Sequence, residues 1–198
     1  MRTFITVCAA VYCLCLGYVS LAGEITQENV HGLNQQSVNV SNVVLSVVIT
    51  NRYIAGDVMP VCVSLKNQSN TDIYFFRGFS ACYDSLDINV SNGEGKKIGL
   101  TEYGSHTINN MENRLRGGMI KLAPGEKVSM DMNLSRLIDL TEAGEYFLSI
   151  GTVVSRTNNW TNLNISLVVD KFKFAVSSPP NQDKYDIEKH LKGYGKGL

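Results

Sequence analysis

Apolar side chains alternate with smaller or polar ones along most of the chain, and a period of two is the pattern of half-buried β-strands. The most regular runs are residues 43–49, 59–65, 128–134 and 146–150. Less regular strands are expected at 73–76, 86–90, 97–100 and 163–176. Because no long amphipathic helix lies between them, short strands at this spacing predict an all-β domain, either a sandwich or a barrel.

Turn-forming residues separate the expected strands. They lie at 67–70, at Asn92-Gly93, at Pro124-Gly125 and at 157–160. The polar segment 101–116 has no clear period, and we expect a long loop there. The run 163–176 changes phase near Val169-Asp170, which predicts a β-bulge.

The first residues have the features of a secretory signal peptide. Arg2 is followed by an apolar stretch at 4–16, and Ser20-Leu21-Ala22 offers the small residues that signal peptidase reads. We therefore expect residues 1–22 to be removed and the exported chain to begin at Gly23. The alternative is a retained membrane anchor, but the apolar stretch falls short of the roughly 20 residues that a span needs. No later segment is long and apolar enough, so we expect a secreted or periplasmic protein with no membrane span after cleavage.

The rest of the chain divides into three parts. Residues 23–37 are expected to form a polar N-terminal lead-in, 38–177 the β-domain, and 178–198 a flexible tail rich in Pro, Lys and Gly. The whole chain has 18 basic and 18 acidic residues. Loss of Arg2 leaves a net charge of about −1, and this near-neutral balance argues against a nucleic-acid partner.

Two of the five cysteines remain after the expected cleavage, Cys62 and Cys82. An even number in an oxidising compartment predicts one disulfide between them. The alternative is two free buried thiols. Since Cys62 alternates with the apolar residues of the run 59–65, it should point away from the core, and any bridge would lie on the outer face of the sheet.

One local motif resembles a known fold family. The segment Glu142-Ala143-Gly144-Glu145-Tyr146 is similar to the D-x-G-x-Y-x-C signature of immunoglobulin-like domains, with Leu148 in place of the cysteine. The resemblance implies an antiparallel immunoglobulin-like β-sandwich of about seven to nine strands. It also implies a tyrosine corner, in which the Tyr146 hydroxyl binds the backbone a few residues upstream. Gly144 would supply backbone freedom, and Glu142 would replace the usual aspartate.

No catalytic residues are predicted. The segment 78–82 approaches the G-x-S-x-G elbow but lacks its last glycine and its helix. The histidines have no neighbours at a metalloprotease spacing. We therefore expect neither an enzyme nor a cofactor.

A copper site is the one metal site worth considering. His106, Met111 and Met119 lie close in sequence to Met130 and Met132, and thioether sulfur is a soft ligand for Cu(I). The alternative is that Met130 and Met132, which share one strand face, are ordinary core residues.

Six N-x-S/T sequons are candidate glycosylation sites if the host modifies exported chains. They begin at Asn39, Asn67, Asn89, Asn133, Asn159 and Asn164. The turn positions Asn67 and Asn159 are the strongest candidates, although asparagine is also a common turn residue.

Two functional hypotheses follow. The first is an exported non-enzymatic module that binds a protein, extracellular-matrix or cell-envelope partner through its loops. A protease-inhibitor variant would present the segment 101–116, with Arg114 and Arg116, to a protease. The second is a carrier of copper or a small ligand that uses His106 and the methionines.

Overall fold

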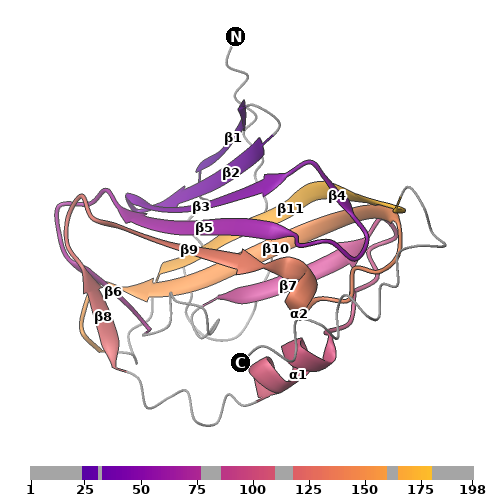
Figure 1. The fold of residues 1–198 in the computed structure, drawn as a ribbon. Helices are drawn as coiled ribbons and strands as arrows, with labels where there is room; N and C mark the ends of the chain where they lie inside the picture. Colours follow the sequence, from indigo (N-terminus) through magenta and orange to yellow (C-terminus); the bar gives the residue numbers. More distant parts are fainter. Residues whose placement is uncertain (1–23, 31–32, 77–85, 110–117, 160–164, 180–198) are drawn as a thin grey trace.

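The computed structural model describes residues 24–30, 33–76, 86–109, 118–159 and 165–179. These residues form two β-sheets that pack face to face as an all-β sandwich (Figure 1). The expected all-β sandwich is therefore confirmed, but the described residues form eleven strands and not the expected seven to nine. The relation to immunoglobulin-like domains stays a resemblance. No helix among the described residues is long and apolar enough to cross a membrane.

The five-stranded sheet is antiparallel throughout. Its strands lie in the order β1-β2-β3-β5-β9. They are β1 (Glu24–Val30), β2 (Leu33–Val40), β3 (Val43–Thr50), β5 (Pro60–Asn67) and β9 (Lys127–Asn133). None of its pairings contains a register shift.

The six-stranded sheet is built around β10 (Gly144–Ser155) and β11 (Ile165–Ser177), its two longest strands. The shorter strands are β4 (Arg52–Ile54), β6 (Ile73–Phe76), β7 (Asp87–Asn92) and β8 (Met119–Leu122). The order is β4-β11-β10-β6-β8, and β7 also pairs with β10. All pairs are antiparallel except β4 with β11.

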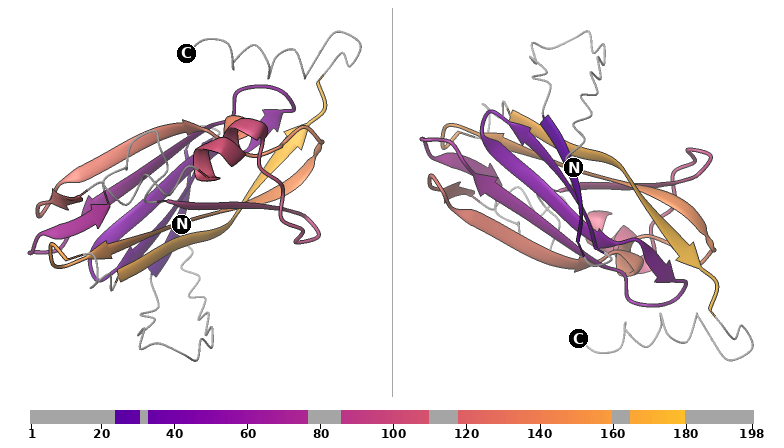
Figure 2. Two further views of the ribbon diagram at one scale, coloured as in Figure 1. Left: turned by 90° about the horizontal axis from the view of Figure 1, so that it is seen from below. Right: turned by 90° about the horizontal axis from the view of Figure 1, so that it is seen from above.

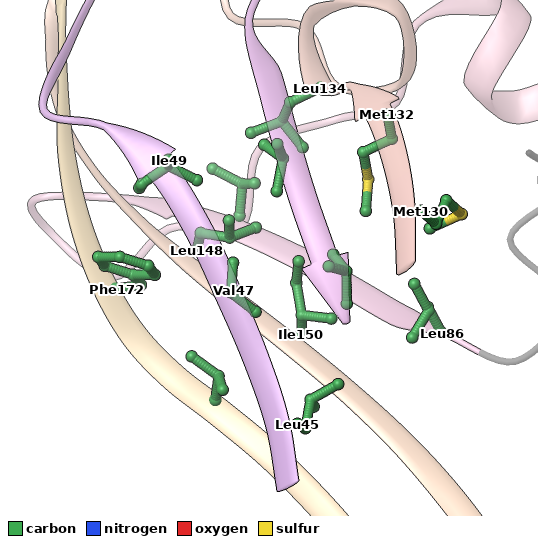
Figure 3. Close-up of a cluster of buried hydrophobic side chains, with 14 of the residues drawn as sticks. Leu45, Val47, Ile49, Leu86, Met130, Met132, Leu134, Leu148, Ile150 and Phe172 are labelled. Carbon is green, nitrogen blue, oxygen red and sulfur yellow. The ribbon is translucent and has the colours of Figure 1, made fainter. Parts of the chain in front are cut away.

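Alternate side chains of both sheets make the core, as the period of two predicts. In β3, residues from Val43 to Ile49 are alternately buried and half-buried. Figure 3 shows Leu45, Val47 and Ile49 of β3 gathered with Leu148 and Ile150 of β10. Met130 and Met132 of β9 are each 5% exposed, so both are core residues.

The predicted β-bulge is present in β11. Leu148 pairs with Phe172, whereas Ile150 pairs with Val169, so β11 has one extra residue over this stretch. Lys171 takes a left-handed conformation there, with φ of 55°. The buried positions therefore change from odd to even numbers along β11, which keeps Phe172 in the core.

Three sequence-based expectations differ from the structure. The lead-in 23–37 contains β1 and the first part of β2, which pair along their whole length although few of their residues are apolar. The expected strand 97–100 has only single bridges, at Lys97 and Leu100. The expected loop 101–116 begins with a helix, α1 (Glu102–Asn109), while residues 110–117 lie outside the described ranges.

Helix α1 forms for local and tertiary reasons. The hydroxyl of Thr101 accepts a 2.9 Å hydrogen bond from the backbone N–H of Gly104, as an N-cap residue does. The helix lies against the short helix α2 (Leu134–Leu137), and the Thr101 N–H donates to the carbonyl of Leu137 over 2.9 Å. Eight residues are too few to reveal a helical period in a polar segment.

Candidate functional site

Four chain connections meet at one end of the sandwich, and we call them the four-loop end (Figure 1). They are residues 41–42, 68–72, 123–126 and 156–159, which follow β2, β5, β8 and β10. The first two follow strands of the five-stranded sheet, and the last two follow strands of the six-stranded sheet. Hydrogen bonds between these connections hold the end of the sandwich together.

Asn67 is the centre of this network. It is fully buried at the end of β5, and its side-chain Nδ2 donates to the carbonyls of Thr71 (2.8 Å) and Leu122 (3.0 Å). Its Oδ1 accepts hydrogen bonds from the Ser69 backbone N–H (3.0 Å) and the Ser69 hydroxyl (2.6 Å). Because Leu122 belongs to the six-stranded sheet, Asn67 joins the two sheets.

The turn at Pro124-Gly125 is fastened to the same residue. Gly125 has a φ of 82°, and the Glu126 N–H donates to the Ala123 carbonyl over 3.1 Å, which is the geometry of a type II turn. The Gly125 N–H donates to the Asn67 carbonyl, and the Asn67 N–H donates to the Glu126 carbonyl. The turn that the sequence predicted is therefore confirmed.

Arg156 joins three of the four connections. Its Nη1 donates to the hydroxyls of Ser69 (2.9 Å) and Thr71 (2.6 Å), and its Nη2 donates to the carbonyl of Ser41 (2.8 Å). Ser41 and Asn42 have φ values of 53° and 62°, as in the tight turn of a β-hairpin. Among the described residues no carboxylate pairs with Arg156, and its guanidinium donates to uncharged hydroxyl and carbonyl oxygens.

The two acidic residues of the four-loop end are already engaged. Asp72 forms a 2.9 Å ion pair with Lys121, and this contact raises the pKa of the lysine. The Glu126 carboxylate accepts a 2.6 Å hydrogen bond from the Ala123 backbone N–H. Lys66 and Lys127 are exposed beside these connections. The described part of this end therefore presents a moderate positive charge.

The exposed side chains here are mostly amides and hydroxyls. They belong to Ser41, Asn42, Gln68, Asn70, Thr71, Thr157, Asn158 and Asn159. Such groups both donate and accept hydrogen bonds. The arrangement can recognise a polar partner on a surface whose backbone is already held in place.

The tyrosine corner lies outside the four-loop end and is structural. The Tyr146 hydroxyl donates to the Glu142 carbonyl over 2.7 Å, as expected from the motif, and the ring stacks on Phe174 with centroids 5.6 Å apart. Burial, with the nearby charges of Glu142 and Asp139, raises the pKa of Tyr146. Gly144 lies in β10 and is not among the glycines with positive φ, and the backbone freedom expected of it stays a prediction.

Two of the expected copper ligands, His106 and Met119, lie on separate elements of the described structure. His106 is exposed on α1, and Met119 is half-buried at the start of β8, which lies apart from α1 (Figures 1 and 2). Met111 lies outside the described residues. Within the described ranges no three His, Cys, Asp or Glu side chains are grouped to hold a metal. The copper hypothesis stays a prediction, which metal analysis of the purified protein can check.

Cys62 lies in β5, opposite Val48 and Asp131, and its half-buried side chain is on the outer face, as the alternation predicted. It is a free thiol, so the expected bridge to Cys82 is not formed in the structure. Cys82 itself lies outside the described residues, because it belongs to 77–85. Burial, with the hydrogen bond and charge of Asp131, raises the pKa of the thiol.

Two other sets of expected site residues have different outcomes. Arg114 and Arg116 lie outside the described residues, so the protease-inhibitor hypothesis stays a prediction. Of the sequons, Asn67 is wrong as a glycan acceptor because its amide is fully buried and hydrogen-bonded. The Asn133 Oδ1 accepts from the Met59 N–H and the Ser135 hydroxyl, so it too has a structural role. Asn159 is exposed.

Sequence reasoning identified three turns of the four-loop end, but neither the turn 41–42 nor Arg156. The arginine lies next to the predicted turn 157–160. The available signal was therefore a long cationic side chain at the start of a turn, which is too common to single out a residue. In comparisons with known proteins, no family model matches the chain and no curated protein matches it.

Proposed function

We propose that this chain is an exported, non-enzymatic binding module whose recognition surface is the four-loop end. The observation that carries the proposal is Arg156, which links three connections through Ser41, Ser69 and Thr71. Loops positioned by a rigid sheet scaffold are a common place for recognition. Loops that are ordered before binding lose less conformational entropy when a partner arrives, and this favours affinity.

The chemistry of this surface favours a polar partner with anionic groups. Asp72 and Glu126 are engaged within the end itself, whereas Arg156, Lys66 and Lys127 have no carboxylate partner among the described residues. Exposed amides and hydroxyls add hydrogen-bonding capacity around these charges. A protein or cell-envelope component that presents carboxylates fits this surface best.

A capture experiment with matched variants tests the proposal. The immobilised protein is incubated with the native extracellular or periplasmic fraction, and bound proteins are identified by mass spectrometry. The wild type is compared with Asn70→Glu and Asn158→Glu, which add negative charge at exposed positions of the four-loop end. Asn51→Glu, an exposed asparagine at the opposite end of β3, is the control.

The proposal expects one partner to be recovered by the wild type and by Asn51→Glu, and to be lost or strongly reduced with the other two variants. Equal capture by all four proteins would overturn the four-loop end as the recognition surface. Salt should weaken the wild-type complex, because charge complementarity between exposed groups is screened.

Export itself is tested by intact-mass measurement of protein from its native compartment. Cleavage before Gly23 would leave β1, which begins at Glu24, complete. We expect the recovered chain to start at Gly23 or within a few residues of it. Recovery of the full-length chain from the membrane fraction would contradict this part of the proposal.

A further inference from the structure

Strand β1 is an edge strand that extends beyond the sandwich. It pairs with β2 along all seven of its residues, from Glu24 with Asn39 to Val30 with Leu33. The six-stranded sheet packs on β2 and β3 through β11, whereas β1 makes its main contacts with β2 alone. Figure 1 shows β1 at the top of the molecule, beyond the other strands.

Along the core-facing side of β2, apolar residues give way to amides. On the core-facing side of β2, Val40 and Val38 are followed by Gln36 and Asn34. The side-chain oxygens of Gln36 and Asn34 are buried and have no hydrogen-bond partner. The outer edge of β1 carries unpaired backbone groups in the described structure.

Other edges of the sandwich have features that oppose pairing with a further strand. β4 and β8, which end the six-stranded sheet, are only three and four residues long. β11 has the bulge at Lys171, together with Asp170 and Lys173, and its last residues are covered by β4. β7 is followed by a tight return in which Ser91 pairs with Lys97. β9 carries an exposed lysine, Lys127, and continues directly into α2. β1 has no bulge, proline or lysine.

The charges of β1 select one way of pairing it with a second copy of itself. In an antiparallel pair centred on Gln27, Thr26 lies opposite Glu28 and Glu24 opposite Val30, so no like charges face each other. A shift by one strand repeat in either direction places Glu28 opposite Glu24 or opposite a second Glu28. Like charges directly opposite each other destabilise a strand pair. The centred pairing also uses all seven residues.

We propose that two copies of this chain associate through antiparallel pairing of their β1 strands, centred on Gln27, so that the two five-stranded sheets become one continuous sheet. The two copies are related by a two-fold axis, which makes the interface closed and self-complementary. The interface runs along the outer edge of β1, whose Glu24 pairs with Asn39, two residues before the connection 41–42 of the four-loop end.

The first test introduces a charge at Thr26, which is exposed and lies opposite Glu28 in the proposed dimer. Dimer dissociation of the chain recovered from an exporting host is measured by analytical ultracentrifugation. Thr26→Glu creates two like-charge pairs, and we expect the dissociation constant of the dimer to increase about three- to tenfold. Thr26→Lys creates two opposite-charge pairs and should decrease the dissociation constant by a similar factor.

The control uses the same substitutions at Ser129, an exposed residue on the opposite edge strand of the same sheet. Ser129→Glu and Ser129→Lys should leave the dissociation constant unchanged. A monomer at every concentration, or equal effects at Thr26 and Ser129, would overturn the proposal. Circular dichroism of each variant verifies that the fold is retained.

A second test traps the pairing register. Gln27→Cys places two thiols opposite each other at the two-fold axis, and mild oxidation should give a covalent dimer whose disulfide joins the two substituted positions. Peptide mapping of the oxidised dimer identifies that link. Asn29→Cys is the matched control, because Asn29 lies opposite Ile25 and not opposite itself. Efficient cross-linking of Asn29→Cys but not of Gln27→Cys would show a different register and refute this one.

Discussion

The hydroxyl of Tyr146 donates a 2.7 Å hydrogen bond to the backbone carbonyl of Glu142, and it thereby fastens the segment that leads into β10. The ring is 4% exposed and packs against Phe174, whereas the neighbouring Phe147 is half-buried on the opposite face. This relationship ranks three substitutions by their expected effect on stability.

Tyr146→Phe keeps the packing and removes the hydrogen bond, so we expect a loss of roughly 0.5–1.5 kcal/mol in the free energy of unfolding. Tyr146→Ala also leaves a cavity, which should cost about 3–5 kcal/mol. Phe147→Ala should cost clearly less than Tyr146→Ala. Chemical denaturation of the three variants measures these differences, and a greater loss for Phe147→Ala would refute the ranking.

Substitution by alanine should affect stability very differently at two glycines, Gly104 and Gly144. A methyl group on Gly104 of α1 would overlap the backbone carbonyl of Leu137, and neither helix backbone can move away without losing its contacts. A methyl group on Gly144 would meet the Tyr146 ring at an ordinary 3.7 Å.

We therefore expect Gly104→Ala to cost about 3 kcal/mol or more, at the upper end for overpacked sites. Gly144→Ala should change stability by less than about 0.5 kcal/mol, as surface substitutions usually do. Thermal unfolding of both variants provides the comparison. Similar losses in the two proteins would mean that α1 does not approach α2 as closely as described.

The core strands could be predicted from the sequence because each one shows its burial through its own residues. In β9, the buried Met130 and Met132 alternate with the polar Ser129, Asp131 and Asn133, and the change of phase at Val169-Asp170 marks the bulge at Lys171. β1 could not be predicted in this way, since its residues are mostly polar and show no apolar period.

The candidate site was harder to predict because it depends on residues far apart in the chain. Arg156 lies 87 residues from Ser69 and 115 from Ser41. The short turns could be located from Asn, Gly and Pro, but no local pattern shows which side chains meet when the turns come together. The same holds for Asn67, whose sequon is explained by its hydrogen bonds to Ser69.

Stability should fall in alkaline solution partly because of Tyr53. Its hydroxyl donates to the Pro60 carbonyl over 2.8 Å and accepts from the Thr50 N–H, and burial raises its pKa. A raised pKa in the folded state favours the neutral phenol. The resulting stability is complete below the pKa of an unfolded tyrosine, roughly 10, and is lost as the pH rises through the folded pKa.

We expect the free energy of unfolding to decline less steeply above about pH 10 in Tyr53→Phe than in the wild type. Urea denaturation at a series of pH values measures the slope. The variant should be less stable than the wild type near neutral pH, because it lacks the hydroxyl that contacts Pro60 and Thr50. Parallel pH profiles for the two proteins would contradict the assignment.

The thiol of Cys62 should react slowly with alkylating reagents in the folded protein. Its pKa is raised by burial and by Asp131, and lowered in part by the charge of Lys127. Asp131→Asn should therefore increase the alkylation rate of Cys62 near pH 8 several-fold, since only the thiolate reacts. Lys127→Gln should change the rate in the opposite direction. Peptide mass spectrometry follows Cys62 alone, and equal rates in both variants would exclude this electrostatic control.

Asn67 provides the sharpest test of how the four-loop end is held, because its side chain is fully buried and makes four hydrogen bonds. Asn67→Asp keeps the shape but places a carboxylate oxygen against the carbonyls of Thr71 and Leu122. Two donated hydrogen bonds are lost, at about 1–3 kcal/mol for each buried group left without a partner. Burial should raise the pKa of the new carboxyl above roughly 3.9. The loss of stability is therefore expected to be smallest below about pH 4 and to grow as the pH rises to 7.

Asn70→Asp, at an exposed position of the same connection, should change stability by less than about 0.5 kcal/mol, with little pH dependence. Denaturation of both variants at acid and neutral pH decides the matter, and an equally small effect at the two positions would mean that Asn67 does not join the sheets.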